Sequence, residues 1–295
     1  MKLALLYEKE EKDTADRLVR NIKRKKYKLT VSSRAVTSDY PESPADCFSG
    51  FSHIMAVLSK SSARTPWFAF TAGFSLGAGR TLLCYPAVPD WVPPPRMDSV
   101  ILITSDKDLE AYLAVETVEW AQKEACRQAK SALLDMGIPF SEESLEHCIQ
   151  ERKNQAVSYF IAAGFSPNAR DKFGVPLLSL AARAGDRNIV KLLLNAGASV
   201  NLQAEDRGTT ALIDSTAGKH IDIMELLLKA GADVNLKSKD GQSALIIAVG
   251  LNDEIAAGLL LKAGANADDP DSLGVSARKY ALLFNKPVMM ELFKT

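Results

Sequence analysis

The sequence predicts two fold classes in one chain, an α/β domain followed by an all-α repeat domain. In the first half, short apolar runs alternate with helical stretches, which is typical of a parallel sheet with helices on both faces. In the second half, glycines recur every 33 or 34 residues, which indicates a stacked repeat. We therefore expect an α/β domain over residues 1–137 and a helical solenoid over residues 138–295.

Length and composition fit this division. The chain has 295 residues, enough for two domains that each bury a core. Its 36 basic and 36 acidic residues cancel, so the charge balance gives no reason to expect a nucleic-acid partner. The first apolar run ends after five residues, too soon for a signal peptide, and no stretch approaches the length of a membrane-spanning helix. We expect a cytoplasmic protein that binds neither membranes nor nucleic acid.

Five apolar runs are expected to form the strands of the α/β domain. They are KLALLY (2–7), YKLTVSS (27–33), HIMAVLS (53–59), RTLLCYPA (80–87) and SVILIT (99–104). Ligands of parallel sheets bind beyond the carboxyl ends of the strands, so a site is expected in the segments that follow these runs. The next segment predicts one long helix or two shorter ones, because Ser105 and Asp108 resemble a capping box and Gly137 suits a helix end.

Cysteines and histidines give no sign of a metal site. The four cysteines contain no C-x-x-C pair, and the three histidines are not spaced to share one helix face. We expect reduced thiols and no bound metal.

The string GFSLG (73–77) has the G-x-S-x-G spelling of a hydrolase nucleophile elbow. An elbow needs a strand, a sharp turn at the serine and then a helix, whereas Thr65 and Pro66 predict a helix that begins before the string. A catalytic Ser75 would also need a histidine, and the two histidines that follow it both lie in the repeat half. We interpret Ser75 as a helical residue and the glycines as small residues that let this helix lie close to the sheet.

Two sets of glycines define the repeat. The first set is Gly197, Gly231 and Gly264, spaced by 34 and 33; the second is Gly174, Gly208, Gly241 and Gly274, spaced by 34, 33 and 33. Variants of a G-x-T-P-L-H-x-A-A pattern follow the second set, such as GVPLLSLAARAG and GQSALIIAVG. We expect the first set to end helices and the second to form hairpin turns, since both positions favour a positive φ.

With this period and pattern, residues 138–295 resemble the ankyrin-repeat proteins. The resemblance implies about five units that stack because no unit buries its own apolar face. The outer two are atypical: the first lacks the G-x-T-P start, and the last has Arg278 where leucine is usual. The histidine of T-P-L-H is replaced in successive units by Ser179, Ile213, Ile246 and Lys279.

Members of that family bind other proteins through the concave face and the hairpin tips, so the resemblance implies a protein partner. The tip residues that we expect to contact it are Lys172, Phe173, Asp206, Arg207, Lys239, Asp240 and Asp271. The alternative is an array that serves only as a scaffold for its own N-terminal domain.

The first half resembles the TIR and TIR-like fold over residues 2–104. The residues that carry the resemblance are V-L-S at 57–59, Thr65-Pro66-Trp67 at an S-x-W position, and FTAGFSLG (70–77) at an F-E-x-G-x-A-x-G position. The resemblance implies a flavodoxin-like sheet of five parallel strands. It also implies a tendency of this domain to self-associate.

The same resemblance bears on catalysis. Active TIR enzymes cleave the glycosidic bond of NAD, and related deoxyribosyltransferases act on nucleosides, both with a glutamate that stabilises positive charge on the sugar. Here that position is Thr71, which cannot supply a negative charge. Glu8 and Asp39 follow the first two strands and, with Trp67, complete the set of pocket candidates.

We therefore expect an interaction protein with a degenerate TIR-like domain, no catalytic residue and no cofactor. The alternative is an enzyme that cleaves NAD or processes nucleosides under the control of its repeats. In that case NAD or a nucleotide would bind the N-terminal domain.

Overall fold

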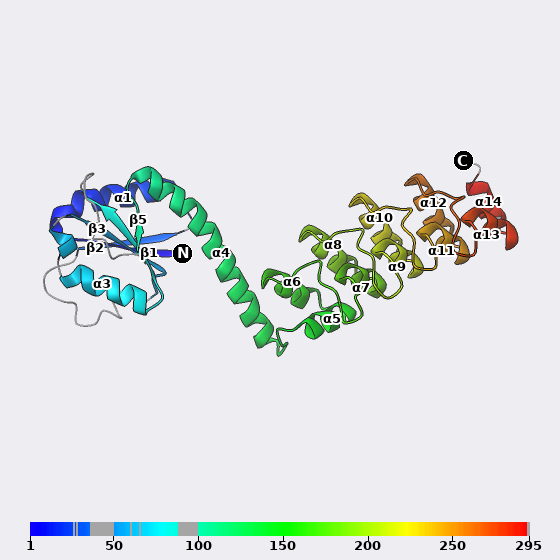
Figure 1. The fold of residues 1–295 in the computed structure, drawn as a ribbon, viewed down its shortest axis with the longest axis horizontal. Coiled ribbons are helices and arrows are strands. Elements are labelled where there is room, and N and C mark those ends of the chain that lie inside the picture. The colour runs from blue at the N-terminus through cyan, green and yellow to red at the C-terminus, as the bar shows by residue number, and fades with distance from the viewer. Residues whose placement is uncertain are drawn as a thin grey trace. The chain divides into compact units, whose positions relative to one another are not determined.

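The computed structural model describes residues 1–25, 27, 29–35, 50–59, 61–64, 66–87 and 100–293 (Figure 1). The chain forms two compact units, Met1–Glu124 and Ala125–Thr295. The division falls within helix α4 (Asp106–Asp135). The boundary at residue 137 that the sequence predicts stays a prediction.

The N-terminal unit is built on a sheet of five parallel strands, as the sequence predicts. The strands are β1 (Lys2–Tyr7), β2 (Thr30–Ala35), β3 (His53–Leu58), β4 (Thr81–Pro86) and β5 (Ile101–Leu102). Their order in the sheet is β2-β1-β3-β4-β5, so that the chain moves to one side of β1 and then crosses to the other. Leu3 of β1 lies opposite Val31 on one side and His53 on the other.

Alternate residues of the central strands point to opposite faces of the sheet and belong to two apolar cores, one on each face. On one face, Leu3 and Leu5 pack with α1 (Lys12–Arg24) and with the first half of α4. On the other face, Ala4 and Leu6 pack with α3 (Pro66–Gly77). Burial on both faces explains why these strands are continuously apolar in the sequence.

Helix α3 contains the GFSLG string and begins at Pro66, as predicted. Ser75 is fully buried, and its Oγ donates a hydrogen bond to the Thr71 carbonyl oxygen at 2.6 Å. This hydroxyl bonds to its own helix in the manner usual for mid-helix serine, so it is not presented as a nucleophile. The interpretation of the glycines was wrong for Gly73 and Gly77, since a Cβ at either would meet no atom of the described residues within 4 Å.

The long helix that the sequence predicts after β5 is the single helix α4. Ser105 accepts a hydrogen bond from the Asp108 N–H at 3.2 Å and donates to the Asp108 carboxylate at 2.8 Å, which completes the expected cap. Gly137, with φ +69°, follows its end. In the part of the chain that the structure describes, no helix combines the length and apolar character needed to cross a membrane.

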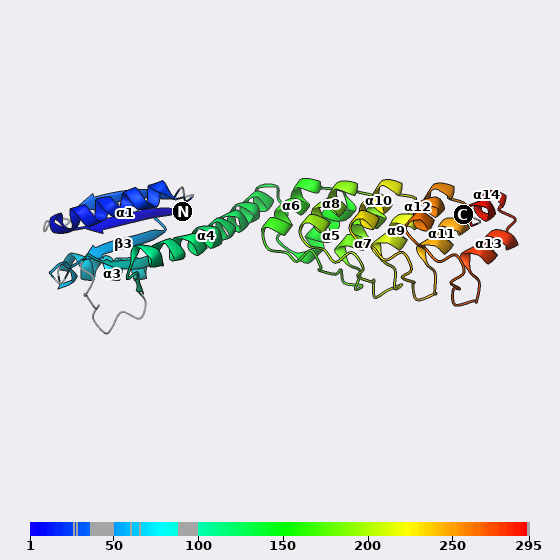
Figure 2. The ribbon, with the colours of Figure 1, turned by 90° about the horizontal axis from the view of Figure 1, so that it is seen from above.

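The C-terminal unit contains five consecutive helix pairs after α4. They are α5 (Glu142–Gln150) with α6 (Asn154–Ala162), α7 (Leu177–Ala184) with α8 (Arg187–Asn195), α9 (Ala211–Ala217) with α10 (Ile221–Lys229), α11 (Ala244–Gly250) with α12 (Glu254–Lys262), and α13 (Ala277–Leu283) with α14 (Pro287–Leu292). First helices stack on first helices and second helices on second helices, and hairpins project from the first-helix side (Figure 2).

Recurrent residues mark the start or the end of most pairs. Thr210, Ser243 and Ser276 cap α9, α11 and α13, and each hydroxyl accepts a backbone N–H three residues ahead. Both predicted sets of glycines have positive φ, for example +91° at Gly197 and +74° at Gly174. One apolar core runs through all five pairs and includes residues from Leu133 to Phe293.

Candidate functional site

Each outer hairpin of the array is closed by an aspartate turn. In the first hairpin, the Asp171 carboxylate accepts hydrogen bonds from the N–H groups of Phe173 and Val175, both at 2.8 Å, while Gly174 supplies the positive φ. In the last hairpin, Asp271 makes the same two bonds at 3.0 Å. The turn therefore holds the residue before the glycine at the tip.

Backbone hydrogen bonds join neighbouring tips into one row. There is one at each junction: Glu205 N–H to the Gly174 carbonyl (3.0 Å), Lys239 N–H to Arg207 (2.8 Å) and Ser272 N–H to Asp240 (3.1 Å). We call the tips 171–174, 205–208, 238–241 and 271–274 the hairpin row. Because main-chain atoms connect the tips, the row presents its side chains at fixed spacings.

An asparagine in successive units ties each unit to the next. Asn201 Oδ1 accepts from the Asp233 N–H at 2.9 Å, and its Nδ2 donates to the Gly231 carbonyl at 3.4 Å. Asn168 and Asn235 make the equivalent pair of bonds to the units that follow them. We did not predict this role, although the asparagines share the period of the glycines.

Most of the predicted contact residues lie exposed on the hairpin row. They are Lys172, Phe173, Asp206, Arg207, Lys239 and Asp240. Phe173 is 64% exposed, and the Lys172 ammonium lies 5.3 Å from the centre of its ring. Leu273, which the sequence analysis did not select, is 81% exposed at the equivalent position of the last hairpin. The row thus has an apolar side chain near each end and charged side chains between them.

Two of the predicted contact residues also accept hydrogen bonds within their own hairpins. The Asp206 carboxylate accepts from the Arg207 N–H at 2.6 Å and lies 3.5 Å from the Arg183 guanidinium. Asp271 is buried, and besides its turn it accepts a hydrogen bond from the Tyr280 hydroxyl at 2.7 Å. Both carboxylates are therefore occupied within the array.

A charged pair joins the first helices of two neighbouring units, α7 and α9. Arg183 Nε is 3.1 Å from Asp214 Oδ2, and Arg183 Nη2 donates to Thr209 Oγ1 at 3.1 Å. The Asp214 side chain is only 6% exposed. Burial raises the pKa of the Asp214 carboxyl above its ordinary value, although Arg183 acts in the opposite direction. Neighbouring units have Leu180 and Ile247 at this position, so the charge is particular to one unit.

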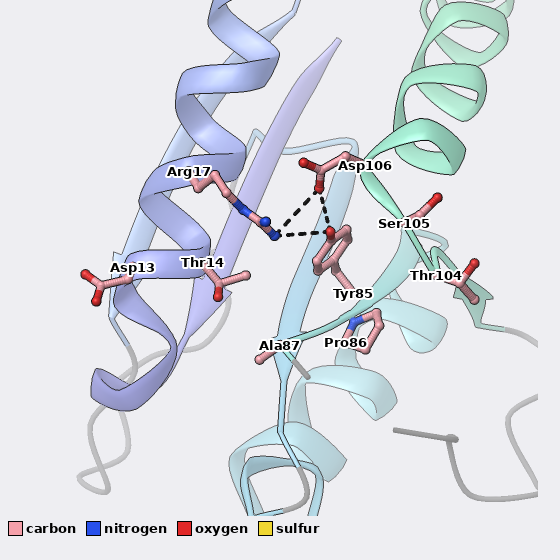
Figure 3. Close-up of a pocket in the computed structure, with 9 residues that line it drawn as sticks. All are labelled: Asp13, Thr14, Arg17, Tyr85, Pro86, Ala87, Thr104, Ser105 and Asp106. Atoms are coloured by element: carbon pink, nitrogen blue, oxygen red, sulfur yellow. Dashed lines mark hydrogen bonds and ion pairs between the residues drawn. The ribbon is translucent and has the colours of Figure 1, made fainter. Parts of the chain in front are cut away.

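The N-terminal unit contains a second candidate site, a cavity of about 480 Å³ at the carboxyl ends of β4 and β5 (Figure 3). It lies where a parallel sheet usually binds ligands. The residues that line it are Asp13, Thr14, Arg17, Tyr85, Pro86, Ala87, Thr104, Ser105 and Asp106.

Three of these side chains form a connected group (Figure 3). The Tyr85 hydroxyl donates to Asp106 Oδ1 at 2.5 Å, and Arg17 Nη2 lies 3.4 Å from the Tyr85 oxygen and 3.7 Å from Asp106 Oδ1. Asn21 donates to the second carboxylate oxygen at 3.1 Å. Burial and the hydrogen bond to Asp106 raise the pKa of Tyr85 to about 12, so this hydroxyl keeps its proton at neutral pH.

Comparison with known proteins places the array in a family. The family model for ankyrin repeats, in three copies, matches residues 145–238. An ankyrin repeat-containing protein of Treponema pallidum (strain Nichols) is 32% identical over 240 residues, which is 81% of this chain and 80% of the relative. The chain belongs to the ankyrin-repeat proteins. The aligned stretch is longer than Ala125–Thr295, so the similarity extends from the ankyrin array into the N-terminal unit.

The structure describes the side chains of two predicted pocket residues of this ankyrin-repeat protein, Glu8 and Thr71, and neither lines the cavity. Glu8 follows β1 and its N–H donates to the Glu11 carboxylate at 2.8 Å. Thr71 is buried on α3, against the opposite face of the sheet from α1 and α4. Trp67 belongs to α3, but its side chain lies outside the described residues, as does all of Asp39.

The chemistry of the cavity follows from its charges. Two carboxylates, Asp13 and Asp106, line it with one guanidinium, Arg17, so its net charge disfavours an anionic ligand. Both oxygens of Asp106 already accept hydrogen bonds. Among the residues that the structure describes, no three histidine, cysteine or acidic side chains are placed to hold a metal ion.

Proposed function

We propose that this ankyrin-repeat protein is an interaction protein that binds a protein partner along its hairpin row. The observation that carries the proposal is the row itself. Its tips are joined backbone to backbone, and six of the seven predicted contact residues are exposed there. A rigid row binds with little loss of conformational entropy, which favours affinity.

The side chains of the row define the chemistry of the partner. Phe173 and Leu273 offer exposed apolar contacts near the two ends of the row. Arg207, Lys239 and Asp240 lie between them and carry both signs of charge. The proposed partner therefore has two separated apolar contacts with polar and charged groups of both signs between them.

Site-specific photo-cross-linking tests this proposal. A benzophenone amino acid replaces Phe173 in one variant and Leu273 in another, and the full chain is irradiated in an extract of its source cells. We expect both variants to capture the same protein. The control carries the probe at Lys191, which is exposed on α8. This helix lies on the side of the array opposite the hairpins (Figure 2). Equal capture from Lys191, or different proteins from the two tips, would contradict the proposal.

The N-terminal unit is proposed to be a TIR-like domain without catalytic activity. Support comes from its five parallel strands, from α3 between β3 and β4, and from the threonine at the position where the enzymes have glutamate. Thr71 is also buried, so no polar group of its side chain is presented to solvent.

The alternative is glycosidic-bond cleavage. The carboxylate of Asp106 beside a cavity favours it, whereas the net charge of the cavity disfavours an anionic substrate such as NAD. Incubation of the purified protein with NAD, followed by measurement of nicotinamide, separates the two proposals. We expect no release above that of an Asp106→Asn variant. Release that Asp106→Asn abolishes would establish the enzyme instead.

A further inference from the structure

The residue before the turn glycine lies at the tip of each hairpin, and its chemistry differs from one hairpin to the next. From the first hairpin to the last, these residues are Phe173, Arg207, Asp240 and Leu273, and all four are exposed. Because main-chain hydrogen bonds join neighbouring tips, the order of these residues along the hairpin row is fixed. The row therefore presents an apolar, a basic, an acidic and an apolar side chain in that order.

The charges of Arg207 and Asp240 are available to a partner. The Arg207 guanidinium makes no hydrogen bond to a described residue, and its ion pair with Asp206 is long, at 3.8 Å from Nε to Oδ2. The Asp206 carboxylate is already engaged by the Arg207 N–H and by Arg183. Asp240 accepts from Ser272 through its main-chain carbonyl, and among the described residues its carboxylate has no hydrogen-bond or ion-pair partner.

The other charged side chains of the row make contacts inside the array. The Lys239 ammonium donates to the Glu205 carbonyl, and the Glu205 carboxylate lies 3.7 Å from the Arg170 guanidinium. The Lys172 ammonium lies over the ring of its neighbour Phe173. The three aspartates that accept hydrogen bonds within their own hairpins are Asp171, Asp206 and Asp271. The two middle tip residues therefore carry the least engaged charges of the row.

We propose that the hairpin row fixes the direction in which its partner binds. The partner is a segment of another protein that places an acidic side chain against Arg207 and a basic side chain against Asp240, between two apolar contacts. In the reverse direction each of these charges would meet a like charge of the row, and like-charge contacts disfavour the wrong arrangement. This inference rests on the proposed function, because it gives the chemistry and the direction of the partner at the same site.

The size of the row favours such a segment over a second copy of this chain. The order of the tip residues is complementary to itself when two rows run in opposite directions, so charge alone would allow a dimer. A stable dimer contact uses about 20 to 30 residues on each side, whereas the row has four tips of four residues each. The row is therefore the size of a contact with one segment of a partner.

Photo-cross-linking with an exchanged pair of charges tests the proposal. The benzophenone amino acid replaces Phe173 or Leu273 in the full chain, and mass spectrometry maps the cross-linked positions on the captured partner. In the wild-type background we expect an acidic residue of the partner nearer the Phe173 contact and a basic residue nearer the Leu273 contact. In the double variant Arg207→Asp, Asp240→Arg we expect the two contact positions to exchange, or capture to fall about tenfold, because both charge contacts become repulsive.

The matched control is the double variant Lys191→Glu, Glu225→Lys. These two residues are exposed at equivalent positions of α8 and α10, so the control exchanges one pair of charges between neighbouring units without altering the row. We expect its contact positions and its capture to match those of the wild-type background. Circular dichroism of both double variants checks that the helices of the array remain folded.

The outcomes separate this inference from the proposed function. Unchanged contact positions and unchanged capture in the double variant of Arg207 and Asp240 would overturn the inference and leave the proposed function standing. An equal loss of capture in the control variant would also overturn it, since the effect would not depend on the row. Capture of a second copy of this chain by both probes would show that the partner is the chain itself. Absence of capture by either probe in the wild-type background would remove the proposed function and this inference together.

Discussion

The buried pair of Arg183 and Asp214 offers the most informative perturbation of the array. Replacing Arg183 with methionine keeps much of its apolar volume but leaves the Asp214 carboxylate, 6% exposed, without its partner. Loss of one member of a buried ion pair costs about 3 to 5 kcal/mol. Because the Arg183 side chain is 26% exposed, we expect the lower end of that range, about 3 kcal/mol.

The double variant Arg183→Met, Asp214→Leu is expected to recover most of this loss. The positions equivalent to Asp214 in the two neighbouring units hold Leu180 and Ile247, so an apolar side chain fits at this position of the repeat. We expect the double variant to lie within about 1 kcal/mol of wild type, because apolar replacement of a buried pair is often neutral.

The pH dependence of the single variant gives a second check. Burial raises the folded-state pKa of Asp214 above its ordinary value of 3.8, so the folded state takes up a proton at higher pH than the unfolded state does. The destabilisation of Arg183→Met is therefore expected to shrink as the pH falls from about 7 to about 5.

Urea unfolding followed by far-ultraviolet circular dichroism measures these differences, because all three tryptophans lie in the N-terminal unit and report little on the array. A loss below about 1 kcal/mol for the single variant, or a double variant no more stable than the single one, would refute the reasoning.

Three further outcomes are expected. Burial lowers the pKa of His53 below 6.5, so the unfolded chain binds the extra proton and the N-terminal unit loses stability as the pH falls from about 7 to about 5; tryptophan fluorescence should show this loss, and His53→Gln should reduce it. Burial raises the pKa of the Cys84 thiol to about 12, so native alkylation mapped by mass spectrometry should modify the more accessible Cys126 well before Cys84. Asn201→Ala should lower the unfolding free energy of the array by about 1 to 2 kcal/mol through loss of two inter-unit hydrogen bonds, whereas Asn195→Ala on the exposed side of α8 should not.

The repeat half was predictable because its signals are periodic. A glycine with positive φ has few substitutes, so Gly174 and Gly197 mark a turn and a helix end in the sequence alone. The same period contains Asn201, whose side chain was overlooked because exposed asparagine is common in loops. Only the spacing of its equivalents distinguishes it from an ordinary surface residue.

The strands and helices of the N-terminal half were also predictable, because buried parallel strands are continuously apolar. The role of the α3 glycines was not, since sequence cannot tell whether a small residue faces the sheet or the solvent. A Cβ at Gly73 would meet no atom of the described residues within 4 Å, whereas Ser75 is fully buried.

The cavity escaped prediction for a different reason. Arg17, Tyr85 and Asp106 come from three elements that are far apart in the sequence, and none belongs to a recognisable motif. In the sequence, Arg17 cannot be distinguished from the other cations of a basic helix. Asp106 likewise looks like an ordinary acidic residue in the first turn of a helix. Only the order of the strands brings α1 and α4 to the same face of the sheet and so assembles the group.

Hydrogen–deuterium exchange of the full chain, with and without the partner captured by cross-linking, tests the central claim most directly. We predict slower exchange at the four tips of the hairpin row and little change in α8, α10 and α12. Protection of the second helices with unchanged exchange at the tips would contradict the account.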